Sequence, residues 1–264
     1  TDQNHIEAAQ VFWSKCQKNG DIYKKMYTIS YCVGCELEKN VSDLVDGKCP
    51  LHPTEKIELI EEENYFFKFS KYQNELLNLY ELNKEFVKPE GKLSEISSFV
   101  SGGLKDFSIS RLKEKMSWGV PIPNDDKHVM YVWFDALVNY VSTIGWPKNI
   151  NNFNKFWPVI QIAGKDNLRQ QAAMWQAMLI SAGISNSKQI LINGFINVEG
   201  QKMSKSLGNV ISPSEMFNRY GTDGTRYLLM NLGPFGSDMD VSWDKFDSTF
   251  NSALSNGLGN LCSR

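Results

Sequence analysis

The sequence predicts an α/β fold built around a parallel sheet. From about residue 128 onward, β-rich runs alternate with helical stretches. Such alternation is typical of parallel strands that are joined by crossover helices. The expected strands are 128–134, 157–163 and 189–196, and the expected helices are 135–143 and about 166–182.

Helix signals elsewhere in the chain come from apolar spacing and from capping residues. Apolar residues recur at helical spacing over 4–19, and a glycine ends the run. Residues 70–73 and 212–215 each combine a serine with a Gln or Glu three residues later, which is the pattern of a capping box. A proline directly after the second serine strengthens that helix start.

The composition is that of a globular protein with a hydrophobic core. Hydrophobic residues make up 42% and charged residues 22% of the 264 positions. No run of about 18 apolar residues occurs, so we expect no membrane span. An odd number of cysteines and no secretory signal favour a reducing compartment, with the cytoplasm expected and an organelle as the alternative. The first residue is not methionine, so we expect the start to be an internal cut.

Two short loops that carry cysteine and histidine are spaced like a zinc site. Cys32 and Cys35 are separated by two residues, and Cys49 and His52 form a second pair with the same gap. Three thiolates and one imidazole can surround Zn²⁺ tetrahedrally, and thiolates favour zinc over Mg²⁺ or Ca²⁺. Because protein side chains fill all four positions, we expect one structural zinc per chain. Buried cysteines that bind no metal, or a redox pair, are the alternatives.

A loop rich in lysine and serine follows the third expected strand. Between flanking glycines, residues 200–208 include Lys202, Ser204 and Lys205. Ammonium groups offset the charge of a polyphosphate, and they matter most when charge moves in a transition state. Open α/β sheets bind ligands past the carboxyl ends of their strands, where this loop lies. Composition alone leaves a solvated turn as the more common interpretation of such a loop.

Short strings along nearly the whole chain carry a family signature. They occur at 20–23, 31–36, 46–50, 62–67, 107–111, 118–121, 131–140, 164–166 and 258–261, and as Lys-Met-Ser-Lys-Ser at 202–206. In these strings the chain resembles the methionyl-tRNA synthetases of the single-zinc bacterial or organellar type. These enzymes are class I aminoacyl-tRNA synthetases, whose second signature is the Lys-Met-Ser-Lys-Ser string.

The resemblance implies both an architecture and a reaction. Residues 1–17 would end the first half of a Rossmann-type domain, 18–115 would form an inserted zinc-knuckle domain, 116–235 the second Rossmann half, and 236–264 the start of an α-helical anticodon-binding domain. The implied reaction joins methionine and ATP, with Mg²⁺, into methionyl-adenylate and passes the methionyl group to tRNA(Met). In this family the protein mainly positions and neutralises its substrates.

The resemblance also implies roles for single residues. Lys205 and Lys202 are expected to be catalytic, because they match lysines that stabilise the ATP phosphates. The expected ATP contacts are Gly164, Asp166, Ile196, Lys202, Ser204 and Lys205. The expected methionine contacts are Trp133, Ala136, Leu137, Tyr140, Asn167 and Gln171. Aromatic rings suit a thioether, although core packing is the simpler interpretation of Trp133 without the resemblance.

The chain departs from the family pattern in several places. Gln170 and Gln171 stand where a Phe-His pair is usual, Asn167 replaces an aliphatic residue, and Asn193 replaces a histidine. The first ATP signature of the family, a His-x-Gly-His string, does not occur in the chain. We therefore expect the isolated chain not to form the adenylate. We also expect its sheet to have an unpaired edge and exposed apolar surface.

Two other classes of protein remain as alternatives. A zinc module that binds RNA without catalysis would be expected to carry a strongly basic surface, whereas the formal net charge here is −2. A sister class I synthetase for leucine, valine or isoleucine would be expected to carry a much larger editing insertion. In the cysteine enzyme the zinc binds substrate, whereas here all four zinc positions are filled by protein.

Overall fold

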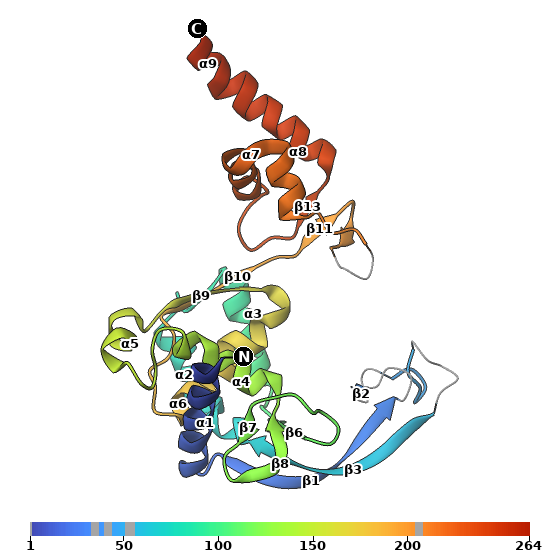
Figure 1. The fold of residues 1–264 in the computed structure, drawn as a ribbon, viewed down its shortest axis with the longest axis vertical. Helices are drawn as coiled ribbons and strands as arrows, with labels where there is room; N and C mark the ends of the chain where they lie inside the picture. Colours follow the sequence, from blue (N-terminus) through green and yellow to red (C-terminus); the bar gives the residue numbers. More distant parts are fainter. Residues whose placement is uncertain (1, 33–36, 40–43, 51–55, 204–207) are drawn as a thin grey trace. The chain divides into compact units, whose positions relative to one another are not determined.

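The computed structural model describes residues 2–32, 37–39, 44–50, 56–203 and 208–264 (Figure 1). The chain forms two compact units, each made of three separate stretches. The first unit comprises Thr1–Leu79, Ser98–Val159 and Ala173–Ser187, and the second comprises Tyr80–Ser97, Ile160–Ala172 and Lys188–Arg264. Across the described ranges, every helix is too short or too polar to cross a membrane.

The first unit opens with the helix that apolar spacing predicts over 4–19. Helix α1 (Gln3–Lys18) begins at Asp2, whose carboxylate accepts a hydrogen bond from the backbone N–H of His5 at 2.9 Å. This side-chain cap satisfies one of the N–H groups that the first turn leaves open. The chain leaves the helix through Gly20, which has φ +76. The buried face of α1 consists of Ala8, Ala9, Phe12, Trp13 and Cys16.

A long antiparallel ribbon follows α1 (Figure 1). It belongs to a four-stranded sheet with the order β2-β1-β3-β5, formed by β1 (Ile22–Cys32), β2 (Leu37–Lys39), β3 (Ile57–Phe67) and β5 (Phe107–Ser108). The two long strands pair along their whole length, from Ile22 opposite Phe67 to Cys32 opposite Ile57. The ribbon therefore brings the two ends of segment 32–57, which contains all four expected zinc ligands, to the same place.

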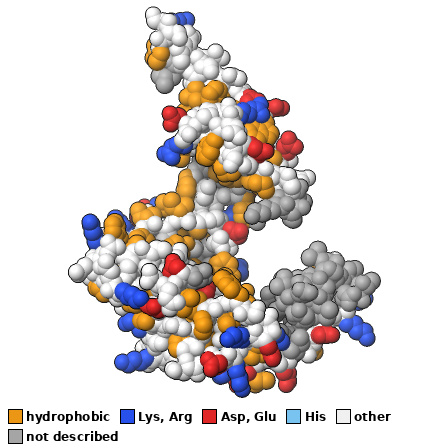
Figure 2. Space-filling model, in the orientation of Figure 1, with side chains coloured by type: hydrophobic (Ala, Val, Ile, Leu, Met, Phe, Trp, Pro, Cys, Tyr) orange, Lys and Arg blue, Asp and Glu red, His pale blue; other side chains and the backbone are white. Residues whose placement is uncertain are grey.

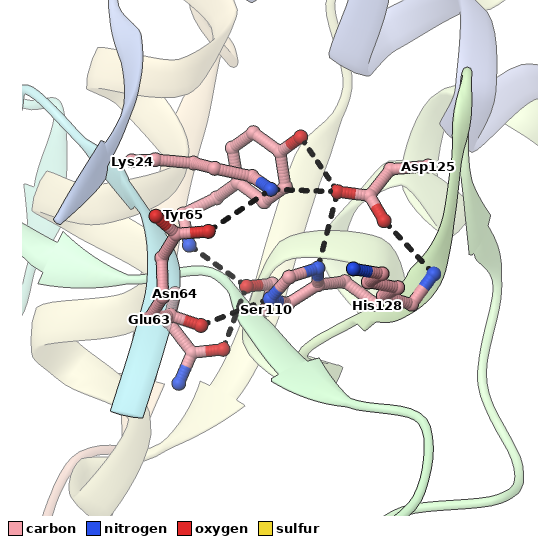
Figure 3. Close-up of polar contacts among 8 residues, drawn as sticks. Lys24, Glu63, Asn64, Tyr65, Ser110, Asp125 and His128 are labelled. Carbon is pink, nitrogen blue, oxygen red and sulfur yellow. Dashed lines mark hydrogen bonds and ion pairs between the residues drawn. The ribbon is translucent and has the colours of Figure 1, made fainter. Parts of the chain in front are cut away.

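The carboxylate of Asp125 joins this ribbon to a second antiparallel sheet (Figure 3). Asp125 accepts hydrogen bonds from Lys24 Nζ of β1 at 3.0 Å and from the Tyr65 hydroxyl of β3 at 2.9 Å. The Nδ1 atom of His128 lies 3.1 Å from the same carboxylate, and its Nε2 atom lies 2.9 Å from the Glu63 carbonyl oxygen. The second sheet has the order β6-β8-β7, with β6 at Ser110–Leu112, β7 at Pro121–Ile122 and β8 at Asp125–Met130.

The strand predicted over 128–134 is wrong in its second half and in its partners. Strand β8 ends at Met130 and pairs antiparallel with both neighbours. Helix α4 (Val132–Ser142) begins directly afterwards, earlier than the predicted helix 135–143. Its aromatic and β-branched first turn favours a strand by propensity. Packing overrides that preference, because the Phe134 ring lies 5.1 Å from that of Trp13 in the core.

A buried carboxylate connects α1 to the segments that follow the ribbon. Asp21 is fully buried and accepts hydrogen bonds from Lys71 Nζ at 2.7 Å and from Ser181 Oγ at 2.8 Å. The capping box predicted at 70–73 is wrong: Ser70 lies inside a short 3₁₀ helix, and its hydroxyl donates to Asp106 at 2.6 Å. Lys71 belongs to η2 (Phe69–Tyr72) and Ser181 to α6 (Trp175–Ser181), and the chain also forms α2 (Gln73–Leu82) and α5 (Ile150–Phe156).

The second unit contains the parallel sheet that the sequence predicts. Its order is β4-β10-β9, with β4 at Val87–Lys88, β9 at Ile160–Gly164 and β10 at Gln189–Asn193. Among the described strands, β9 pairs on one side only, and it exposes 49% of Ile160 and 66% of Ile162. The predicted open edge with apolar surface is therefore confirmed for this part of the chain. Helix α3 (Glu90–Ser101) follows β4.

The helix predicted over about 166–182 is divided into three pieces. The 3₁₀ helix η3 (Lys165–Asn167) and the π-helix η4 (Gln170–Met174) precede α6. Short 3₁₀ and π segments of this kind are frequent at functional positions. Apolar spacing alone did not reveal these breaks.

The remainder of the second unit packs around its own small core. A sheet with the order β12-β11-β13 is formed by β11 (Ile196–Val198), β12 (Gln201–Lys202) and β13 (Met239–Val241). The predicted capping box at 212–215 is confirmed at the start of α7 (Pro213–Met230). Helices α8 (Trp243–Thr249), η5 (Phe250–Gly259) and α9 (Asn260–Ser263) follow. The core residues are Met216, Tyr220, Leu228, Val241 and Phe246.

Candidate functional site

The carboxyl ends of two parallel strands lie together in the second unit. In the register of β9 and β10, Gly164 is opposite Asn193, so the loops that follow both strands start side by side. Parallel α/β sheets bind ligands at such an edge. Two of the expected ATP contacts, Gly164 and Asp166, lie here. A Cβ on Gly164 would meet Asp166 Oδ1 at 2.9 Å, so the carboxylate lies over the glycine.

The loop after β9 is fastened to the segment that enters β13. Lys165 Nζ lies 2.6 Å from Asp238 Oδ2 and 4.3 Å from the centre of the Phe195 ring. The other carboxylate oxygen of Asp238 accepts a hydrogen bond from the backbone N–H of Phe195 at 2.9 Å. The amide oxygen of Asn193, which stands where the family usually has histidine, accepts from the Gly236 N–H at 3.0 Å.

The Lys-Met-Ser-Lys-Ser string starts in a tight hairpin between β11 and β12. Glu199 and Gly200 form its turn with φ values of +51 and +78. Asp240 Oδ1 accepts a hydrogen bond from the Gly200 N–H at 2.6 Å. Ile196, an expected ATP contact, begins β11 and is half-buried. The backbone of Lys202 pairs in β12, whereas its side chain and the expected residues Ser204 and Lys205 lie outside the described part of the chain.

In the first unit, helix α4 carries four of the six expected methionine contacts. Trp133, Ala136, Leu137 and Tyr140 follow each other at helical spacing, so they share one side of α4. Leu137 is buried, Trp133 and Tyr140 are half-buried, and Ala136 is exposed. The Tyr140 ring lies 6.2 Å from that of Trp175. Their contact with methionine remains a prediction.

A cavity of about 390 Å³ in the first unit borders the same helix. Of the four expected residues on α4, Ala136 lines it, together with the buried carboxyl group of Asp135. Burial raises the pKa of Asp135 to about 6, and a hydrogen bond from the Ala136 N–H partly opposes that shift. Apolar and aromatic residues that line the cavity include Met116, Trp118, Met130, Tyr131 and Val132.

The two other expected methionine contacts lie in the second unit. Asn167 ends η3, and its amide donates to Asp166 Oδ1 at 3.5 Å. Gln171 is buried, and its Oε1 atom accepts a hydrogen bond from Gln161 Nε2 at 3.2 Å. The glutamine that replaces the family's usual histidine is thus held by a second amide, which fixes its orientation.

The expected zinc ligands are only partly described. Cys32 ends β1, although its side chain lies outside the described atoms, as do Cys35 and His52 entirely. Cys49 is buried, and it follows a turn closed by the Val45–Lys48 bridge with φ +51 at Asp46 and φ +73 at Gly47. Among the described residues, no three metal-binding side chains come together. A buried thiol next to a tight turn fits the donor chemistry of a thiolate site.

Sequence reasoning missed the acidic residues of the second unit. Asp238 and Asp240 each bind a backbone N–H of the loops at this edge, and Lys165, which lies in the family string at 164–166, binds Asp238. The only signal available in the sequence was the alternation of the two aspartates around Met239 in a short β-rich run. The backbone N–H groups that they bind lie about forty positions away, and Lys165 lies 73 positions from Asp238, so the sequence did not show which of these groups they bind.

The fold and this edge define an α/β protein with a candidate ligand site at the carboxyl ends of parallel strands. A family model described as tRNA synthetases class I (M) matches residues 1–58 and 38–264. The chain therefore belongs to the methionyl-tRNA synthetase family within the class I tRNA synthetases.

Individual relatives agree with this assignment. The chain is 43% identical to a methionine–tRNA ligase of Synechocystis over 270 residues, covering all of this chain and 50% of the relative. It is 44% identical to the methionine–tRNA ligase of Rickettsia typhi, covering 52% of that protein. A solved Mycobacterium tuberculosis methionyl-tRNA synthetase in complex with methionyl-adenylate superposes with a TM-score of 0.88 at 40% identity, over 99% of this chain and 52% of that one. The chain thus spans about half the length of these relatives.

Proposed function

We propose that this chain is part of a methionine–tRNA ligase. The complete protein would use ATP and Mg²⁺ to activate methionine as methionyl-adenylate and would then charge tRNA(Met). The observation that carries the proposal is the shared edge of β9 and β10, where the Gly-Lys-Asp loop and the path into the Lys-Met-Ser-Lys-Ser string begin side by side. The superposition on a synthetase that holds methionyl-adenylate supports the same site.

The expected ATP-binding residues form two groups, one for the adenosine and one for the phosphates. Gly164 and Asp166 would contact the adenosine, because they follow β9 where ligands of parallel sheets bind. Lys202 and Lys205 would neutralise the phosphates and would stabilise the charge that develops as pyrophosphate leaves. Methionine would be held by the side of α4 that carries Trp133, whose aromatic surface suits a thioether.

ATP binding by the chain tests this assignment. We expect Lys205→Ala to weaken the binding of ATP with Mg²⁺ by about tenfold or more, since a contact between an ammonium group and a phosphate is charge-assisted. Equilibrium dialysis with labelled ATP measures this. Lys188→Ala is the matched control, because Lys188 is an exposed lysine of the same unit just before β10. Equal affinities of the two variants would contradict the proposed role of the loop.

We further propose that Cys32, Cys35, Cys49 and His52 hold one structural zinc ion. When bound, the ion would tie together the loops between β1 and β3, which the paired strands bring to one end of the ribbon. Elemental analysis of the purified chain is expected to show about one zinc per chain. The metal should be lost in Cys32→Ser and in Cys49→Ser, and it should be retained in Cys262→Ser, because Cys262 is exposed near the end of the chain. A folded, reduced chain without zinc would refute the site.

The face drawn in Figure 2 gives no support, over its described residues, to the alternative of an RNA-binding module without catalysis. That alternative predicts a strongly basic surface. On the face drawn in Figure 2, positive and negative side chains are interspersed over the described residues, in line with the formal charge of −2. The family assignment likewise favours the methionine enzyme over a sister synthetase.

A further inference from the structure

We propose that Asp238 and Asp240 form a two-point clamp that fixes the adenosine-side loop after β9 relative to the start of the Lys-Met-Ser-Lys-Ser loop. These two carboxylates are called the Asp clamp below. They would act as positioning residues for ATP. This inference rests on the proposed function for its effect on ATP, whereas the coupling between the two loops can be tested without a ligand.

The first point of the clamp holds the ends of the parallel sheet. Asp238 binds Lys165 Nζ through one oxygen at 2.6 Å and the Phe195 N–H through the other at 2.9 Å. These two partners belong to the loops that follow β9 and β10. The hydrogen bonds from Lys165 and from the Phe195 N–H hold the pKa of Asp238 below its usual value, so the carboxylate stays charged at neutral pH.

The second point of the clamp holds the hairpin turn at Gly200. Asp240 Oδ1 accepts from the Gly200 N–H at 2.6 Å, and its other oxygen lies 3.1 Å from Lys245 Nζ. Gly200 has φ +78, a conformation that glycine adopts without strain. A backbone hydrogen bond at this residue therefore sets the direction in which the chain enters the Lys-Met-Ser-Lys-Ser string.

Strand geometry makes the two points a rigid pair. Asp238 directly precedes β13 and Asp240 lies within it. If the alternation of strand side chains is continued by one residue, both carboxylates lie on the same side of this segment, about 7 Å apart along it. On the opposite side, Met239 and Val241 are buried. Strand β13 is also paired with β11, Ile196 lying opposite Met239. A strand held in this way moves as one body, so a shift at one loop is passed to the other.

These ion pairs are partly exposed, so their role in positioning the loops can be tested separately from any contribution to stability. Lys165 and Asp238 are 29% and 44% exposed, and pairs of this kind contribute little to overall stability. Loss of the pair should therefore leave the melting temperature nearly unchanged. Faster hydrogen exchange at the distant Gly200 amide after loss of this pair is the result that only the clamp predicts.

Hydrogen exchange of the ligand-free chain tests the clamp directly. We expect Lys165→Met and Asp238→Ala each to speed exchange of the Gly200 amide by about tenfold, as expected when an ordering contact to a charged group is lost. The exchanged pair, Lys165→Asp with Asp238→Lys, restores the ion pair but not the acceptor of the Phe195 N–H, so we expect it to recover slow exchange only in part. Lys188→Met is the matched control: it removes an exposed lysine just before β10 that takes no part in the clamp, so exchange should stay within about twofold. If Gly200 exchanges at the wild-type rate in Lys165→Met and in Asp238→Ala, the clamp is overturned.

Binding of ATP to such variants then tests whether the clamp positions the loops for ATP. We expect Lys165→Met and Asp240→Ala to weaken ATP binding by about tenfold relative to Lys188→Met, while adenosine binding changes less in Asp240→Ala, because the adenosine-side loop is intact there. Equal ATP affinities in Asp240→Ala and Lys188→Met would overturn the positioning role. If the wild-type chain binds neither ATP nor adenosine, the proposed function fails, and the ligand-free exchange still decides whether the two loops are coupled.

Discussion

Replacing Gly194 with alanine should lower the free energy of unfolding of the second unit by about 3 kcal/mol or more. A Cβ at this position would lie 2.2 Å from both the carbonyl carbon and the oxygen of Ser237, and 2.4 Å from the nitrogen of Asp238. These are backbone atoms, so no flexible side chain can move aside. The segment after β10 would have to separate from the segment that enters β13. Urea unfolding measures the loss of stability.

Gly91→Ala provides a matched control for this substitution. Gly91 lies in the first turn of α3 in the same unit, and a Cβ there would meet nothing within 4 Å. Alanine restricts the unfolded chain and favours the helix, so we expect this variant to be more stable by roughly 0.5 kcal/mol. Equal stability of Gly194→Ala and Gly91→Ala would show that the two segments do not pack as closely as described.

Asp125→Ala should destabilise the first unit by about 2–3 kcal/mol, because several hydrogen bonds to one charged, largely buried group are lost together. The substitution leaves the Tyr65 hydroxyl, the Nδ1 atom of buried His128 and Lys24 Nζ without their common acceptor (Figure 3). It also removes the acceptor of the Lys127 N–H, which lies 2.8 Å away. We expect the connection of β8 to the β1–β3 ribbon to weaken, with the contact of His128 Nε2 with the Glu63 carbonyl oxygen left in place, and amide exchange in both strands to increase.

The loss of stability in Asp125→Ala should depend on pH in a defined direction. Burial alone would raise the pKa of Asp125, but hydrogen bonds from Lys24, the Lys127 N–H and Tyr65 hold it well below the ordinary value. A depressed pKa adds stability above the unfolded value of about 3.9, and that stability is lost as the pH falls toward the folded value. The deficit of Asp125→Ala should therefore be constant near neutral pH and smaller at about pH 3.

Asp126→Ala serves as the control for Asp125→Ala. Asp126 is the next residue of β8 and is exposed, so its loss should change stability by no more than about 0.5 kcal/mol at any pH. Urea unfolding of both variants near pH 7 and near pH 3 gives the comparison. A pH-independent deficit in Asp125→Ala would mean that the carboxylate contributes through packing and not through its charge.

The features that the sequence predicted correctly depend on residues close together in the chain. Helix α1 follows from apolar spacing and from a glycine at its end, and the start of α7 follows from a serine and a glutamate three residues apart. The parallel pairing of β9 and β10 follows from strands separated by a helical stretch. Family membership likewise follows from short strings, each of which lies within one loop or one element.

Other elements were decided by contacts that cross the chain. Residues 132–134 have strand propensity, yet they form the first turn of α4, because Phe134 fills a core made with Phe12 and Trp13. Residues 70–73 have the sequence of a capping box, but the Ser70 hydroxyl donates its hydrogen bond to Asp106. In both cases the competing partner lies more than thirty positions away, and its energy exceeds the local preference.

By itself the sequence determined the chemical inventory of this protein: the family strings, the Cys and His spacing, the Lys-rich loop and the helices with local caps. Tertiary structure alone decided how the ends of β9, β10 and β13 meet, and that Asp238 and Asp240 bind the loops there. The physical reason is distance along the chain. Caps and periodicity act within one or two turns, whereas a carboxylate binds whichever N–H or cation the fold places beside it.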